Sequence, residues 1–211
     1  MSAKWYTGDM DIEHIKQWLG AGSINIFGRP FAGKDTQGKL LVDLVGGVVL
    51  SGGEILRNSH IPEHVAKIMY EGGLVPSDDY VNIVLPYLSK EEFRGKPLIL
   101  SSVGRWIGEE QGVMRALEAS AHPLRAVIYL DIPEDYVRER WQAISEHTDR
   151  SGRQDDSPGV LEHRLEEYRE KTIPVIETYE KLGLLIRIDG TGTPEEVHRQ
   201  IISRLNELAA K

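Results

Sequence analysis

Residues 28–36 are the part of this sequence whose residue types and spacing are most specific for a chemical task. They read GRPFAGKDT and fit the pattern G-x-x-x-x-G-K. Glycines let a backbone curl so that several N–H groups point inward at a phosphate, and a helix that starts after the loop adds the positive end of its dipole. The stretch therefore predicts a loop that binds nucleotide phosphates.

Two side chains of this loop have expected roles toward ATP. Lys34 would reach the outer phosphates, and the Thr36 hydroxyl could bind Mg²⁺. Asp35 stands where the common motif has Ser or Thr, and its carboxylate is compatible with phosphates only if it points away from them. The alternative is that residues 28–36 form a glycine-rich turn needed only for tight packing. The strand predicted before these residues and the helix predicted after them favour the phosphate-binding loop instead. We expect the ATP site to include Phe31, Ala32, Gly33, Lys34, Asp35 and Thr36.

Short apolar runs alternate with helical patterns around this loop. Strands are predicted at 23–28, 47–50, 97–101, 126–132 and 184–189. Helices are predicted at 12–19, 39–44, 54–57, 62–71, 78–88, 110–120, 134–143, 160–182 and from Pro194 onward. The strands are continuous apolar runs, as expected when helices cover both faces of a parallel sheet. We therefore predict an α/β fold, a P-loop three-layer α/β/α arrangement with a parallel sheet. Residues 145–159 are too polar for a core element and predict a mobile surface segment.

Composition limits the possible functions. The chain has 211 residues and predicts a single domain over 1–211. Its net charge of −8 argues against general binding to nucleic acid. We find no apolar stretch long enough to span a membrane, no secretory signal and no cysteine. We expect a cytoplasmic monomer with no membrane or nucleic-acid partner.

Five motifs, in the same order as in adenylate kinases, give the chain a resemblance to that family. The loop GRPFAGKDTQ comes first, and LSGGEILR (50–57) resembles the start of the family's monophosphate-binding segment. GLVPSDDYV (73–81) resembles the end of that segment, and SSVGR (101–105) stands where the family has a strand end followed by Phe-Pro-Arg. RSGRQDD (150–156) resembles the family's lid, and HRLEEYREKTIPVIETYEKLG (163–183) resembles the helix that follows the lid.

The resemblance implies positions for the substrates and for two insertions. It implies an N-terminal extension over 1–22, a monophosphate-binding insertion over 51–80 and a short lid over 142–158. Arginines suit phosphoryl transfer because they are permanently charged and bidentate. The catalytic residues that it implies are Lys34, Arg105, Arg140, Arg153 and Arg164. The monophosphate site that it implies is formed by Gly52, Arg57, Leu74, Val75, Arg105, Gln111, Arg153 and Arg164, and Arg140 also belongs to the ATP site.

The chain departs from the family at several of these positions. Gly52 replaces Thr of adenylate kinases or Ala of pyrimidine monophosphate kinases. Ser101 replaces an Asp that helps to hold the magnesium water shell. The family's base-reading Gln lies four residues after its Arg, where this chain has Glu109. We expect Gln111 to take that role after a small insertion. In the lid, Arg150 could replace a further family arginine, and Asp155 and Asp156 would orient the lid arginines.

The resemblance implies reversible phosphoryl transfer from ATP to a nucleoside monophosphate, with AMP favoured, so that ATP and AMP give two ADP. A kinase for UMP, CMP or a deoxynucleotide monophosphate is an alternative, which Gly52 keeps open. A weakly active or non-catalytic nucleotide-binding protein is a second alternative, which Ser101 and the altered loop favour.

Overall fold

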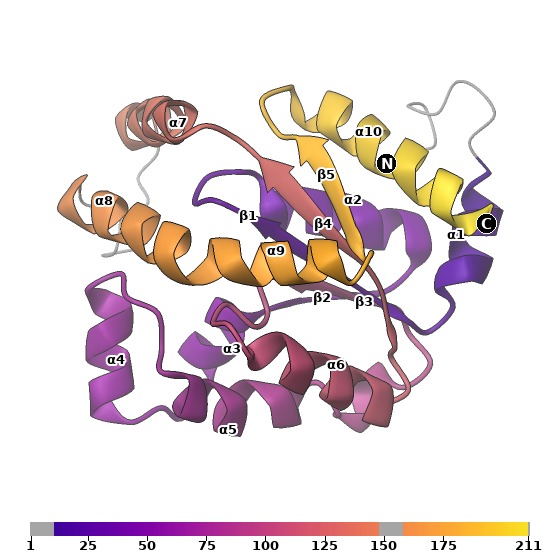
Figure 1. Cartoon of the computed structure of the whole chain (residues 1–211), viewed down its shortest axis with the longest axis horizontal. Helices are drawn as coiled ribbons and strands as arrows, with labels where there is room; N and C mark the ends of the chain where they lie inside the picture. The colour runs from indigo at the N-terminus through magenta and orange to yellow at the C-terminus, as the bar shows by residue number, and fades with distance from the viewer. Residues whose placement is uncertain (1–10, 148–157, 211) are drawn as a thin grey trace.

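A five-stranded parallel sheet forms the centre of the computed structural model, which describes residues 11–147 and 158–210 (Figure 1). The strands are β1 (Ser23–Gly28), β2 (Val48–Ser51), β3 (Leu98–Ser101), β4 (Leu124–Asp131) and β5 (Leu185–Asp189). They lie in the order β2-β3-β1-β4-β5. Every residue of β1 is buried, as the continuous apolar runs predicted. The predicted parallel α/β sheet is confirmed.

Helices cover both faces of the sheet. The helices of the described residues are α1 (Ile12–Leu19), α2 (Lys34–Val45), α3 (Gly52–Asn58), α4 (Glu63–Tyr70), α5 (Ser77–Tyr87), α6 (Glu109–Ala119), α7 (Glu134–His147), α8 (Pro158–Glu167), α9 (Ile173–Lys181) and α10 (Pro194–Ala209). A 3₁₀ turn, η1 (Glu91–Phe93), precedes β3, and a π-helical turn, η2 (Tyr168–Thr172), joins α8 to α9. Among the described residues, no helix combines the length and apolar character that a membrane span needs.

Alternate residues of the central strands fill two different cores. Ile26 of β1 and Ile128 of β4 belong to the core shared with α1, α2 and α10. Phe27 and Tyr129 belong to the opposite core, which includes Tyr179 of α9. Figure 1 shows α10, α2 and α1 on one side of the sheet and α6 and α9 on the other. The three layers follow from the period of two along each strand.

Helices α3, α4 and α5 extend from the β2–β3 edge and have an apolar cluster of their own. Leu56 of α3, Val65 of α4 and Val84 of α5 are buried there with residues of β2, β3 and α6. Figure 1 shows these helices beneath the sheet. The insertion predicted over residues 51–80 falls within this segment, in which α5 runs on to Tyr87.

Helix α1 belongs to the core of the fold. Its Ile15 and Leu19 are buried, and it packs against α10 and α2. The N-terminal extension expected over residues 1–22 therefore includes α1, which belongs to the helical layer that α1, α2 and α10 form on one face of the sheet.

Candidate nucleotide and phosphoryl-transfer site

A pocket of about 580 Å³ opens between the phosphate loop, the α3–α5 segment and helices α7 and α8. It lies beyond the carboxyl ends of β1 and β3, where parallel α/β sheets bind ligands. The sequence-predicted residues that line it are Phe31, Ala32, Gly33, Lys34, Asp35, Thr36, Arg57, Leu74, Val75, Arg105, Arg140 and Arg164. Residues from distant parts of the chain thus meet at one site large enough for nucleotides.

The phosphate loop has the backbone geometry that its glycines predict. Gly33 precedes α2 with a φ of 88°, a left-handed conformation that suits glycine. Phe31 also has a positive φ, of 62°. Lys34 Nζ donates hydrogen bonds to the Gly28 carbonyl at 2.8 Å and to the Arg29 carbonyl at 2.9 Å. These bonds hold the lysine across the loop, at the N-terminus of α2.

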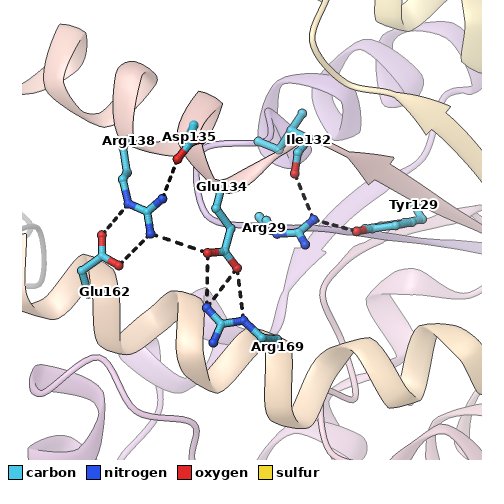
Figure 2. Close-up of polar contacts among 8 residues, drawn as sticks. All are labelled: Arg29, Tyr129, Ile132, Glu134, Asp135, Arg138, Glu162 and Arg169. Carbon is cyan, nitrogen blue, oxygen red and sulfur yellow. Dashed lines mark hydrogen bonds and ion pairs between the residues drawn. The ribbon is translucent and has the colours of Figure 1, made fainter.

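Arg29 anchors this loop to the end of β4. Its Nη1 donates to the Tyr129 hydroxyl and to the Ile132 carbonyl, both at 2.9 Å (Figure 2). The guanidinium also lies 5.8 Å from the centre of the Tyr168 ring. Arg29 fills a variable position of the motif, so the sequence pattern gave no reason to single it out.

Arg140 of α7 borders the loop from the other side. Its guanidinium donates to the Phe31 carbonyl at 3.0 Å and lies 4.6 Å from the centre of the Tyr136 ring. A second guanidinium nitrogen donates to the Gly192 carbonyl at 3.3 Å. Arg140 is therefore held beside the phosphate loop and the β5–α10 connection, and its role toward ATP stays a prediction.

Arg105 and Arg164 are close enough within the pocket for their charges to interact. Burial, and then the charge of Arg164, lower the pKa of Arg105 to about 10. The Arg105 Nε atom is buried and has no hydrogen-bond partner among the described residues. Arg57 lines the same pocket from α3 and is exposed. Two guanidinium groups whose charges interact within one pocket favour an anionic ligand there.

An ion-pair network fixes α7 relative to α8 outside the pocket. Arg138 of α7 forms hydrogen bonds of 2.8 and 2.9 Å to the two carboxylate oxygens of Glu162 of α8 (Figure 2). Arg169 of η2 donates to Glu134 Oε1 of α7 at 3.1 Å. This network holds the helix of Arg140 against the helix of Arg164.

Asp35 and Ser101 are hydrogen-bonded to each other at the pocket. The Ser101 hydroxyl donates to Asp35 Oδ1 at 3.0 Å. The start of α2 thus places a carboxylate beside the end of β3, where the family pattern has its Asp. Thr36, the next residue, also lines the pocket.

The structure brings Glu109, and not Gln111, to the pocket. Gln111 is exposed on α6 and does not line the pocket, because α6 begins at Glu109 without the small insertion that we expected. Glu109 is 4% exposed and lines the pocket. Its Oε2 accepts hydrogen bonds from Arg105 N at 2.7 Å and Trp106 N at 3.0 Å. The residue four places after Arg105, and not Gln111, is therefore the one at the pocket.

The Gly52 position differs from our expectation. Gly52 is buried and does not line the pocket. A Cβ atom added to it would lie 2.6 Å from the Tyr80 hydroxyl oxygen, which accepts a hydrogen bond from Gly104 N at 3.1 Å. Tyr80, itself at the pocket, fills the space that a side chain at position 52 would need.

Part of the expected lid lies outside the described residues. These positions include Arg150, Arg153, Asp155 and Asp156. At the two ends of the expected lid, 142–158, α7 continues to His147 and α8 begins at Pro158.

Comparisons with known proteins agree with this arrangement. The family model described as adenylate kinase matches residues 26–184. An adenylate kinase of Hyphomonas neptunium is 35% identical over 190 residues, which cover 87% of this chain and 98% of that protein. One of Thermus thermophilus is 34% identical over 193 residues, covering 89% and 99%. A gluconokinase structure from Sinorhizobium meliloti has the same fold, with a TM-score of 0.63, 18% identity, and 90% and 94% of the two chains covered. The chain belongs to the adenylate kinase family.

Proposed function

We propose that this protein is an adenylate kinase, which reversibly transfers the terminal phosphoryl group of ATP to AMP and forms two ADP. The observation that carries the proposal is the shared pocket of Lys34 and the Arg105–Arg164 pair. Two phosphorylated substrates bring the negative charge that this cluster of cations favours. Membership of the family and the adenylate kinase relatives support AMP as the acceptor over pyrimidine monophosphates.

Each substrate has its own group of residues in this proposal. ATP binds to the loop residues from Phe31 to Thr36, with Arg140 beside them. Arg57, Arg105 and the backbone near Leu74 and Val75 bind AMP. Phosphoryl transfer needs little covalent chemistry from a protein, so alignment and neutralisation of charge are the main contributions. Lys34, Arg105, Arg140 and Arg164, together with Arg153 of the lid, supply that neutralisation.

Magnesium is the cofactor that we infer, and the residues present fit it. Mg²⁺ prefers oxygen ligands, keeps several waters and is bound largely through substrate phosphates. The Thr36 hydroxyl and the Asp35 carboxylate lie together at the pocket, and Ser101 orients the carboxylate. The described residues contain no group of three His, Cys, Asp or Glu that could hold a metal ion. When bound, the ion would neutralise charge on the phosphate oxygens.

We propose a monomer with ATP and AMP as its partners and no membrane partner. Absence of cysteine supports a cytoplasmic location, and the net charge of −8 argues against general binding to nucleic acid.

A coupled assay of ADP formation tests the proposal. ATP and Mg²⁺ would be supplied with AMP, dAMP, CMP, UMP or GMP in turn, and kcat/KM compared. We expect AMP to give the highest value. Absence of ADP formation with every acceptor, or a higher value with UMP or CMP, would contradict the proposal.

A further inference from the structure

Two neighbouring backbone groups of the pocket are held by side chains from two other parts of the chain. They belong to residues 72–75, which lie between α4 and α5, line the pocket and are called the acceptor wall below. Leu74 N donates a hydrogen bond of 3.0 Å to Glu167 Oε2 at the end of α8. The Val75 carbonyl accepts a hydrogen bond of 2.9 Å from the indole N–H of Trp106. The acceptor wall is thus tied both to α8 and to the loop before α6.

Lys171 of η2 connects these two ties. Its Nζ donates to both carboxylate oxygens of Glu167, at 2.5 and 2.6 Å. The same Nζ lies 4.2 Å from the centre of the Trp106 ring. A cation over an aromatic ring is attracted to the negative charge of its face. A closed ring of contacts results, which runs through Leu74, Val75, Trp106, Lys171 and Glu167.

The acceptor wall also packs closely against α8. Gly72 has a φ of 81°, and a Cβ atom added to it would lie 2.7 Å from Val160 Cγ1 and 3.1 Å from Arg164 Cγ. Glycine suits both the left-handed conformation and the close approach. On the other side of the ring, Trp106 directly follows Arg105 in the chain. The contacts that hold the acceptor wall therefore join it to the elements of both pocket arginines.

Glu167 and Lys171 stand outside the pocket themselves. Glu167 is 8% exposed, and neither residue lines the pocket. A buried carboxylate needs a partner of opposite charge, because an unpaired charge away from water costs much free energy. Lys171 is that partner. The pair can therefore influence a ligand in the pocket only through the groups that it holds.

We propose that Lys171 and Glu167 are positioning residues for the acceptor monophosphate. The inference rests on the proposed function, in which AMP binds beside Leu74 and Val75. The pair acts through Trp106 and Leu74 and holds the acceptor wall in its binding conformation before AMP binds. A site that is already formed binds its ligand more tightly, by the factor by which the competent state is more populated. ATP binds at the phosphate loop, so the pair should affect the binding of AMP and not that of ATP.

The first test needs no substrate. Amide hydrogen exchange of Leu74, followed by NMR in the ligand-free protein, reports whether its N–H is held. We expect protection in the wild type and roughly tenfold faster exchange in Lys171→Met, which loses the attraction to the ring and a charge-assisted hydrogen bond. Lys90→Met is the matched control, because Lys90 Nζ lies 3.6 Å from the centre of the Tyr87 ring and neither residue lines the pocket. An unprotected Leu74 amide in the wild type, or equal acceleration in the control, would overturn the inference.

The second test is steady-state kinetics with each substrate varied in turn. Lys171→Met should raise the KM for AMP roughly tenfold and leave kcat and the KM for ATP within about twofold of the wild type. Lys171→Arg should restore most of the affinity for AMP, because a guanidinium keeps the charge and stacks on an indole. Lys171→Met leaves Glu167 without its cation and could fail to fold. The double variant Lys171→Met/Glu167→Gln has no unpaired buried charge, still loses the contact with Trp106, and should also raise the KM for AMP alone.

An equal rise in the KM for AMP and for ATP, or no rise for AMP, would overturn the inference, since residues that only stabilise the fold do not distinguish the two substrates. The same selective rise in Lys90→Met would also overturn it. Failure of the wild type to phosphorylate AMP would instead contradict the proposed function, and the exchange of the Leu74 amide would still decide whether the pair holds the acceptor wall.

Discussion

The Ser101 hydroxyl donates a hydrogen bond of 3.0 Å to Asp35 Oδ1, so the first turn of α2 and the end of β3 share one polar contact at the pocket. The family pattern has its carboxylate on the strand. Here the carboxylate is on the helix and a hydroxyl is on the strand, and the two side chains touch. The two departures from the pattern are therefore one exchange of positions.

This exchange predicts compensation between the two residues. Ser101→Asp alone would put a second carboxylate within hydrogen-bond distance of Asp35, and like charges at this distance repel. Asp35→Gly alone would remove the carboxylate. We expect each single variant to raise the Mg²⁺ concentration for half-maximal turnover by about tenfold, and the double variant to recover much of the loss. Magnesium-dependent binding of ADP, measured by calorimetry, gives a readout besides turnover. Additive losses in the double variant would contradict the exchange.

Lys34→Met should remove most of the turnover. Loss of a preorganised charge near the transferring group costs several kcal/mol of barrier. The variant also loses the hydrogen bonds of Lys34 Nζ to the Gly28 and Arg29 carbonyls. We therefore expect the free energy of unfolding to fall by about 1 kcal/mol, the scale of such bonds. Single-turnover kinetics and chemical denaturation measure the two effects. Near-normal turnover would exclude the role proposed for Lys34.

A side chain at position 52 should lower the stability of the protein while Tyr80 is present. The added Cβ of Gly52→Ala would lie 2.6 Å from the Tyr80 hydroxyl oxygen, which must move. Overpacking of this kind costs about 1–3 kcal/mol of stability. Tyr80→Phe removes that oxygen, so Gly52→Ala should cost less in the Tyr80→Phe background. A double-mutant cycle by chemical denaturation measures the coupling. Equal costs in both backgrounds would show that the two residues are independent.

Arg153 belongs to the predicted lid, and the resemblance to adenylate kinases implies that it binds the transferred phosphoryl group. Arg153→Ala should lower kcat on the order of 10³-fold, the scale of an arginine that stabilises transferring phosphate, with a smaller effect on ATP affinity. Arg115→Ala is a suitable control, because Arg115 is exposed on α6 and does not line the pocket. Near-normal kcat in Arg153→Ala, measured by rapid quench, would exclude this role.

The sequence by itself determined the fold class, the order of elements and the phosphate loop. Each depends on local chemistry: continuous apolar runs such as residues 23–28 form strands buried on both faces, and glycines around residue 33 permit a left-handed turn before a helix. The four-residue spacing from Arg105 to Glu109 is also local. That spacing alone, without an assumed insertion, predicts Glu109 and not Gln111 at the pocket. Only the tertiary structure decided that Ser101 meets Asp35, that Tyr80 fills the space beside Gly52, and that Arg105 and Arg164 line one pocket. The two members of each pair are far apart in the chain, so no local pattern records that they lie together. A residue that departs from the family pattern can be replaced in its role by another residue only if the two lie close together in the folded chain. That proximity depends on how helices and strands pack against one another, and no local stretch of sequence shows it.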